Sequence, residues 1–451
     1  MDWIFWYDWM LFPLYFIFIY KFFTSWGRKH YSGEKLKYFK YGIFIKLLGG
    51  ISFAFYHGYI FNGGDTFLFF DTGIKITDYF FTDINRFFSL VFLPTNVTEP
   101  IFPDYLDGII RDENNFFSSR LTAVLGLITF KAYFPTVLIF SALSYLGIWY
   151  AFTSISRLFP GLQKEFAFIF LFIPSTLLWG SGLGKDSLTY GGICLVFGAL
   201  IRLFLLSKPK ILKNTILLLI GGSVVIIIKS YIIYPFLITF GIGIFLEKFI
   251  KIKSKALKKI SFPIFLILIS FFLYITYDAI NSSEAFKLDT IADKVVKTGN
   301  YLSNTDRAGS SYDLGLDLKS IQSFSSLLPV FPKSIITTLF RPYIWEIRNP
   351  VMLLNGLENF LMLYYLLVTL FKRRIFGIFS IMLKNPIIIS CLLYTIIFAA
   401  LVGITSGNFG TLVRYKIPCI PFFCIWLLVL NKGNTLKIPE SLKNRLADVP
   451  S

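Results

Sequence analysis

The chain has 451 residues, of which 55% are hydrophobic and 16% charged, and several apolar runs reach the ~20 residues needed to cross a bilayer. This composition excludes an ordinary soluble domain and predicts an all-α polytopic integral membrane protein, folded as one transmembrane domain over residues 1–451. The formal net charge of +18 would suggest nucleic acid in a soluble chain, but in a membrane chain the distribution of basic residues matters more, so we expect the lipid bilayer and no nucleic acid as partner.

Apolar runs in chain order predict eleven crossings: 3–23, 42–60, 133–156, 164–181, 187–206, 212–228, 231–248, 260–277, 352–371, 385–404 and 414–430. Lysine and arginine concentrate in the loops that follow every second crossing and in the tail, namely 24–41, 207–213, 248–259, 372–384 and 431–451. Basic loops tend to stay in the cytoplasm. The pattern therefore places the N-terminus outside and the C-terminus, with a cytoplasmic tail at 431–451, inside.

Two long loops are then expected on the extracytoplasmic side. The first, 61–132, is rich in Asp and Glu over 61–117, and its segment 118–131 is expected to be an interfacial or re-entrant helix. The second, 278–351, ends in an apolar piece, 323–340, that we expect on the membrane surface. Both loops would lie where candidate site residues gather.

Cysteine and histidine offer little chemistry. The four cysteines all lie in apolar runs, which argues against a disulfide framework, and the two histidines form no Cys/His cluster of the kind that binds zinc. No metal site is predicted and no cofactor is identified; a requirement for a divalent cation is left open.

The stretch "WGSGLGKDSL" at 179–188 places a glycine-rich turn, Lys185 and Asp186 between two apolar runs. It is not a phosphate-binding P-loop, because Trp179 stands where the first glycine belongs and Asp186 follows the lysine in place of Ser or Thr. In the predicted topology this turn faces outside. Three further segments with basic residues, 229–231, 341–350 and 407–416, are also predicted to face outside; they contain Lys229, Arg341, Arg348, Arg414 and Lys416.

Basic groups on the side where they are otherwise disfavoured indicate anion handling. Lysines, arginines and a glycine-rich helix start bind phosphate through charge and free backbone N–H groups. A carboxylate beside them, Asp65 or Asp186 with Glu346 as a third candidate, could act as general base toward an acceptor hydroxyl. Trp345 could stack on a sugar ring.

Each residue also has a plain structural interpretation. Lys185 and Asp186 could simply pair with each other and cap a helix, and Asp65 could be a turn residue after two glycines. Lys229 could extend to the interface, and Arg414 could anchor the last crossing. Trp345 and Tyr343 could belong to an interfacial aromatic belt.

The motifs "GGD" (63–65), "SGLGKDS" (181–187), "RPYIWE" (341–346) and "NFGTLVRYKIPCIPF" (408–422) resemble those of bacterial multi-pass envelope-glycan enzymes, namely GT-C-type membrane glycosyltransferases and O-antigen-polymerase-like proteins. The resemblance implies a catalytic carboxylate at Asp65 and phosphate contacts from Lys185, Lys229, Arg341 and Arg414.

It further implies a location in the bacterial cytoplasmic (inner) membrane and an enzyme that transfers or polymerises sugars from a polyprenyl-(pyro)phosphate carrier at the outer face. A polyprenyl-phosphate-linked glycan and other glycan-assembly membrane proteins are then the expected partners. The alternatives are a polytopic transporter or lipid-linked oligosaccharide flippase, and a non-catalytic scaffold for envelope assembly.

Overall fold

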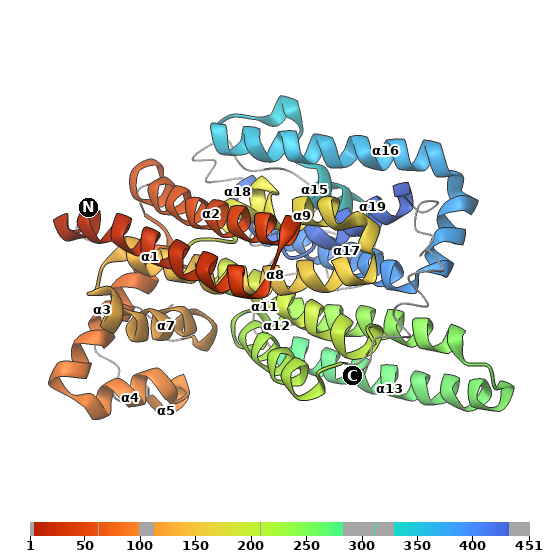
Figure 1. Cartoon of the computed structure of the whole chain (residues 1–451), viewed down its shortest axis with the longest axis horizontal. Helices are drawn as coiled ribbons and strands as arrows, with labels where there is room; N and C mark the ends of the chain where they lie inside the picture. Colours follow the sequence, from red (N-terminus) through yellow and green to blue (C-terminus); the bar gives the residue numbers. More distant parts are fainter. Residues whose placement is uncertain are drawn as a thin grey trace.

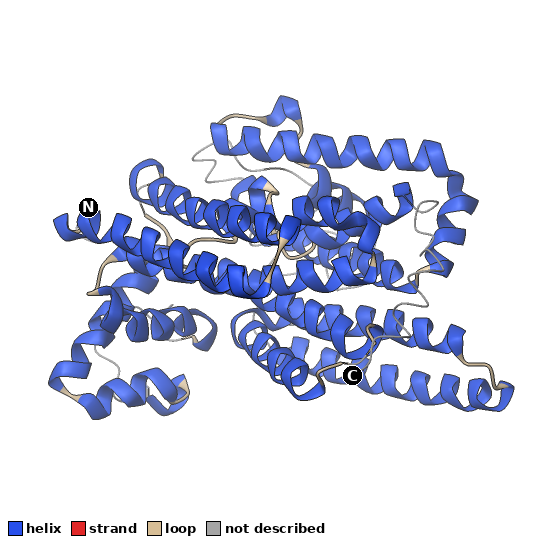
Figure 2. Cartoon of the chain, viewed as in Figure 1, coloured by secondary structure: helices blue, strands red, loops and turns tan. Residues whose placement is uncertain are grey.

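The computed structural model describes residues 4–61, 63–98, 112–207, 209–282, 312 and 329–432. Within these ranges every element is a helix (Figure 2). The predicted tail at 431–451 beyond its first two residues, and most of the second outer loop at 278–351, lie outside the described residues.

The helices of the first half, in chain order, are α1 (Trp6–His30), α2 (Gly33–Phe55) with its π-helical end η1 (Tyr56–Ile60), α3 (Asp65–Thr82), α4 (Ile84–Phe92), α5 (Thr95–Thr98), α7 (Glu113–Thr129), α8 (Tyr133–Leu158), η3 (Pro160–Leu162), α9 (Gln163–Leu171), α10 (Pro174–Trp179) and α11 (Lys185–Leu200) with its π-helical end η4 (Ile201–Leu205). Those of the second half are α12 (Ile211–Lys251), α13 (Lys255–Ser282), α15 (Phe331–Phe340), η7 (Ile344–Glu346), α16 (Pro350–Lys384), α17 (Pro386–Thr405), α18 (Phe409–Tyr415) and α19 (Ile420–Lys432).

Six helices in the described residues are long and apolar enough to cross a membrane, and α18 with α19 make a seventh if the bent pair is one span. The six are α1, α2 with η1, α8, α11 with η4, α12 and α17. The described chain is thus helical, with several segments able to span a membrane, as the composition predicts. The count of eleven crossings and their orientation stay predictions.

Two predicted crossings are not continuous helices. The run 164–181 is broken between α9 and α10, and the run 414–430 is bent by 66° between α18 and α19. Proline explains both interruptions: Pro174 opens α10 and Pro418 follows α18. Proline lacks a backbone N–H and pushes the preceding residue out of the helical region. Both apolar runs were wrongly predicted as single helices.

The long helix α12 reverses direction at Lys229, whose φ of −149° and ψ of 72° are not helical. Before this residue Gly221 packs against the middle of α11. Lys229 itself lies beside Asp186 at the start of α11, and Phe240 then packs on Phe197 further along that helix. Along α12, the contacts with α11 thus run from the middle of α11 to its start and then back along it. The helix α12 therefore consists of two arms that both lie along α11. Lys229 stands at their tip.

The helices α8, α11 and α12 form the centre of the bundle (Figure 1). The contact of α8 with α11 is close because Gly147 and Gly191 face each other. In contrast, α16 lies at one edge of the bundle with many exposed apolar side chains. Small residues at helix interfaces and apolar side chains facing outward are typical of membrane bundles.

The first outer loop, predicted at 61–132, is largely helical. α3 packs along α7, and α4 is joined to α7 by Arg120, whose Nε donates to the carbonyl oxygen of Leu90 at 2.9 Å. The interfacial segment expected at 118–131 is part of α7.

In the second outer loop, the described part of the apolar piece 323–340 forms α15. This helix does not lie free on a surface but packs on α17, where Thr338 donates to the carbonyl oxygen of Ala399 at 2.7 Å. The placement of 323–340 on the membrane surface stays a prediction.

Candidate functional site

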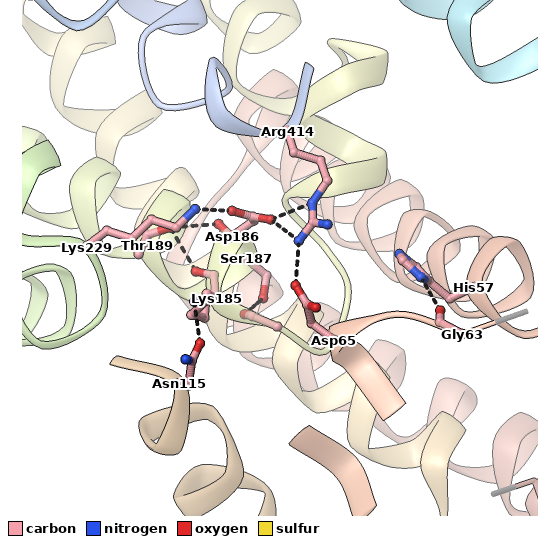
Figure 3. Close-up of polar contacts among 11 residues, drawn as sticks. His57, Gly63, Asp65, Asn115, Lys185, Asp186, Ser187, Thr189, Lys229 and Arg414 are labelled. Carbon is pink, nitrogen blue, oxygen red and sulfur yellow. Dashed lines mark hydrogen bonds and ion pairs between the residues drawn. The ribbon is translucent and has the colours of Figure 1, made fainter. Parts of the chain in front are cut away.

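Four helices bring charged residues together at one end of the bundle. Asp65 begins α3, Asp186 lies in the first turn of α11, Lys229 sits at the tip of α12, and Arg414 is carried by the short helix α18 (Figure 3). These residues are far apart in the sequence, so the site depends on the packing of the whole bundle.

Asp186 is at the centre of this cluster and is almost fully buried. One carboxylate oxygen accepts a hydrogen bond from Lys229 Nζ at 2.5 Å. The other accepts a hydrogen bond from Arg414 Nε at 3.0 Å and forms an ion pair with Nη2, also at 3.0 Å. Lys229 also lies 4.4 Å from the ring centre of Tyr415. Two cations thus neutralise Asp186, and a carboxylate held in this way is a poor proton acceptor.

Asp65 is much less constrained. Its side chain is 59% exposed and its contact with Arg414 Nη2 is 3.7 Å long. Gly63 and Gly64 precede it with φ of 148° and 108°, a backbone conformation that favours glycine. The "GGD" motif therefore has a structural reason, since the two glycines turn the chain into α3 and present Asp65 beside Arg414.

A small, partly open pocket lies at this cluster. Its lining includes residues from the first turns of both α3 and α11, together with Trp179, His57 and Arg414. Neither helix has a side-chain cap at its N-terminus. Since the first N–H groups of a helix have no partner within the helix and carry partial positive charge, the pocket combines two anion-attracting helix ends with a guanidinium group.

Lys185 and Asp186 do not pair with each other, so the plain interpretation of this motif as a local ion pair was wrong. Lys185 Nζ donates to Asn115 Oδ1 at 2.6 Å and lies 6.0 Å from the ring centre of Phe69. Consecutive helical residues point in directions about 100° apart, so the two side chains contact different helices. Lys185 stands beside the pocket rather than among its lining residues.

Arg341, Glu346 and Trp345 form a separate group. Arg341 Nε contacts both carboxylate oxygens of Glu346, at 3.0 and 3.1 Å, and the backbone N–H of Tyr343 donates to Glu346 at 2.8 Å. The carboxylate of Glu346 therefore fixes the turn that it belongs to. Trp345 is 81% exposed. None of these three residues lines the pocket at Asp65.

Arg341 is stacked in an aromatic surrounding, 5.2 Å from the ring centre of Tyr312 and 5.3 Å from that of Phe409. Burial raises the pKa of the Tyr312 hydroxyl, and the nearby Arg341 opposes this shift. Tyr312 donates to the carbonyl oxygen of Ser406 at 2.5 Å. These contacts indicate a structural role for Arg341 at the start of α18.

His57 was not singled out by the sequence analysis. It lies in the π-helical turn η1, lines the pocket and is 3% exposed. A lone histidine in an apolar run carries no signal of its own. In the fold it packs against the following "GGD", where a Cβ on Gly64 would lie 2.8 Å from His57 Nδ1. Single-turn π-helical segments also occur often at functional sites.

Two buried lysines, Lys46 and Lys416, do not line the pocket. Lys46 donates to the carbonyl oxygen of Gly180, and Lys416 Nζ donates to Asn359 Oδ1 at 2.7 Å. Lys416, expected on the outer face, is fully buried in the packed bundle. In the ranges that the structure covers, no three His, Cys, Asp or Glu side chains are grouped as metal ligands.

Comparison with known proteins finds no match, since no family model, curated protein or solved structure is similar to this chain.

Proposed function

We propose that the protein is a membrane glycosyltransferase or polysaccharide polymerase that acts at the extracytoplasmic face on polyprenyl-(pyro)phosphate-linked sugars in cell-envelope glycan synthesis. The observation that carries the proposal is the pocket in which two uncapped helix N-termini and Arg414 surround the exposed carboxylate of Asp65. One site thus holds groups suited to a phosphate and a candidate general base.

In this reaction the oxygen of an acceptor hydroxyl attacks the anomeric carbon of the carrier-linked sugar. The bond from that carbon to the phosphate oxygen breaks, and the leaving phosphate keeps the electron pair. Asp65 takes the hydroxyl proton, and Arg414 with the helix ends stabilises the charge that develops on the leaving group. Lys185 and Lys229 add positive charge, while Asp186 holds Lys229 and Arg414 in place.

The carrier's lipid tail fits the surroundings of the pocket. The charged cluster lies at the ends of α11 and of the α12 arms, so a headgroup can reach it while the tail remains in the bilayer. Trp345 is exposed and does not line the pocket, so it would contact only distal sugars of the substrate or the membrane interface.

A transporter or lipid-linked oligosaccharide flippase is the second candidate. The broken helices α9–α10 and α18–α19 favour it, because transporters often place substrate at the ends of discontinuous helices. The charged cluster would then bind the phosphate during passage without any transfer of a sugar.

Deletion of the gene, followed by analysis of lipid-linked glycans in each leaflet, distinguishes the two. A transferase deletion leaves an undecorated or unpolymerised intermediate in the outer leaflet, whereas a flippase deletion confines the intermediate to the inner leaflet. Purified protein with a lipid-linked sugar and an acceptor provides the direct assay, and absence of transfer together with normal lipid translocation would reject the enzyme.

A further inference from the structure

His57 is held rigidly at the wall of the pocket. Its Nδ1 lies 2.9 Å from the carbonyl oxygen of Gly63, and the N–H of Gly63 donates to the carbonyl oxygen of His57 at 3.0 Å. The imidazole therefore joins the end of α2 to the loop that leads into Asp65. Figure 3 shows the ring turned toward Arg414 and Asp65.

The contact with Gly63 determines which nitrogen carries the proton. A carbonyl oxygen only accepts hydrogen bonds, so in the neutral imidazole the proton is on Nδ1 and Nε2 is an acceptor. Nε2 is buried and has no hydrogen-bond partner within the part of the chain that the structure describes. Buried polar atoms are nearly always paired, so this acceptor calls for a donor from outside the protein.

Trp179 has the complementary property. It lines the same pocket, its ring centre is 6.2 Å from that of His57, and it is 4% exposed. Its indole N–H is likewise buried without a partner among the described residues. A donor and an acceptor are thus both unsatisfied beside the anion-attracting helix ends. A hydroxyl group both donates and accepts, so it can pair with either of these atoms.

We propose that the ligand of this pocket carries a hydroxyl group close to its anionic group, and that this hydroxyl donates to Nε2 of His57. The inference rests on the proposed function, in which the pocket binds a phosphate, and it narrows the ligand. Sugar phosphates and other polyol phosphates fit, whereas methyl phosphate and the phosphodiester of phosphatidylethanolamine have no hydroxyl next to the anionic group. His57 is then a residue that determines substrate specificity.

The test measures binding to the purified full-length protein in lipid nanodiscs with two probes. Glucose 1-phosphate has hydroxyls next to its phosphate, and methyl phosphate has the same anionic group without them. The wild-type protein should bind glucose 1-phosphate about 5- to 10-fold more tightly, the effect expected for one hydrogen bond. His57→Asn should reduce this ratio to about one, because its amide can still donate to Gly63 but no acceptor remains at the place of Nε2.

Methyl phosphate should bind His57→Asn as it binds the wild type. His57→Gln, whose longer side chain can place an acceptor near the original position, should keep part of the ratio. If the wild-type protein binds both probes equally tightly, the inference is overturned, and a water molecule is the donor to His57. The inference is also overturned if His57→Asn keeps the wild-type preference for glucose 1-phosphate. If neither probe binds the wild type, the phosphate site itself fails and the proposed function falls with it.

Discussion

Asp186 and Lys229 form a buried ion pair, 2.5 Å from carboxylate oxygen to ammonium nitrogen, although 43 positions separate them in the chain. The pair joins the start of α11 to the tip of the two α12 arms, and Arg414 binds the second carboxylate oxygen from α18. Three separate segments of the bundle are thus joined through one carboxylate. The cluster at the pocket therefore has a structural role of its own.

Removal of one member of this pair should destabilise the protein. In Asp186→Ala the buried Lys229 loses its carboxylate partner, which typically costs about 3–5 kcal/mol, and Arg414 keeps only its long contact with Asp65. The thermal transition of the purified protein, followed by intrinsic fluorescence or by size exclusion after heating, should fall clearly. Lys229→Ala should behave similarly. The exposed pair of Asp71 and Lys75 supplies the control, because Asp71→Ala should change stability by less than about 1 kcal/mol.

Asp65→Asn tests the proposed general base. The change keeps the shape of the side chain and removes only a long contact with Arg414, so the thermal transition should stay where it is. Sugar transfer should fall by a factor of roughly 10²–10⁴. Asp71→Asn, in the same helix but outside the pocket, is the matched control and should retain activity. Transfer at the wild-type rate in Asp65→Asn would remove the carboxylate from the reaction.

The apolar runs predict most of the helices because spans of this length and composition have few other structures available in a bilayer. They do not predict breaks. The run 164–181 was treated as one helix although Pro174 lies within it, and the bend after α18 coincides with Pro418. In both places the local effect of proline outweighs the apolar run. Proline alone does not predict the breaks, however, because Pro13, Pro235 and Pro263 lie inside helices.

Hydropathy does not predict partners. Asp186 pairs with Lys229 and Arg414 rather than with its neighbour Lys185, and only the packing of α11 against α12 and α18 determines this. The predicted topology placed these residues on one face of the membrane, and it placed Arg341 there too. In the structure Arg341 instead pairs with Glu346 in a separate group. Asp65 was proposed from its motif, and the structure places it at the pocket. His57 gave no such signal.

Close packing of α8 and α11 yields a prediction about the bundle itself. A Cβ on Gly147 would lie 2.0 Å from the carbonyl oxygen of Gly191, so Gly147→Ala must push the two helices apart. Such overpacking typically costs about 1–3 kcal/mol, and the thermal transition should fall. Gly222→Ala is the matched control, because nothing lies within 4 Å of the added methyl group. Equal stability of both variants would contradict the packing of these helices.

The orientation of the bundle can be tested with cysteine probes in a variant without the native cysteines. Arg28→Cys, Lys210→Cys and Lys255→Cys lie in exposed positions of loops predicted to be cytoplasmic, so an impermeant thiol reagent should not label them in intact cells. Asp83→Cys and Trp345→Cys, exposed on the other side, should be labelled. The reverse pattern would place the pocket at the cytoplasmic face and exclude an extracytoplasmic reaction.

Lys185 supplies the last prediction, because its role differs from that of the neighbouring Asp186. Its amine donates to Asn115 at 2.6 Å and stands beside the pocket at the start of α11. If the charge of Lys185 contributes to phosphate binding, Lys185→Ala should reduce the affinity for methyl phosphate about tenfold, while the thermal transition of the protein changes little. Lys185→Arg should recover part of the affinity, since it keeps the charge but not the compact geometry of the ammonium group.

Two controls separate charge from position. Lys131→Ala removes the same charge from an exposed pair with Asp78, away from the pocket, and should leave phosphate affinity unchanged. Asn115→Ala removes the hydrogen-bond partner of Lys185 but leaves its charge, so affinity should fall less than in Lys185→Ala. Full affinity in Lys185→Ala would restrict the anion site to Arg414 and the helix ends. If Asn115→Ala and Lys185→Ala instead lose the same phosphate affinity, the charge of Lys185 is not what matters, because Asn115→Ala keeps that charge. The lysine would then act by joining α7 to α11.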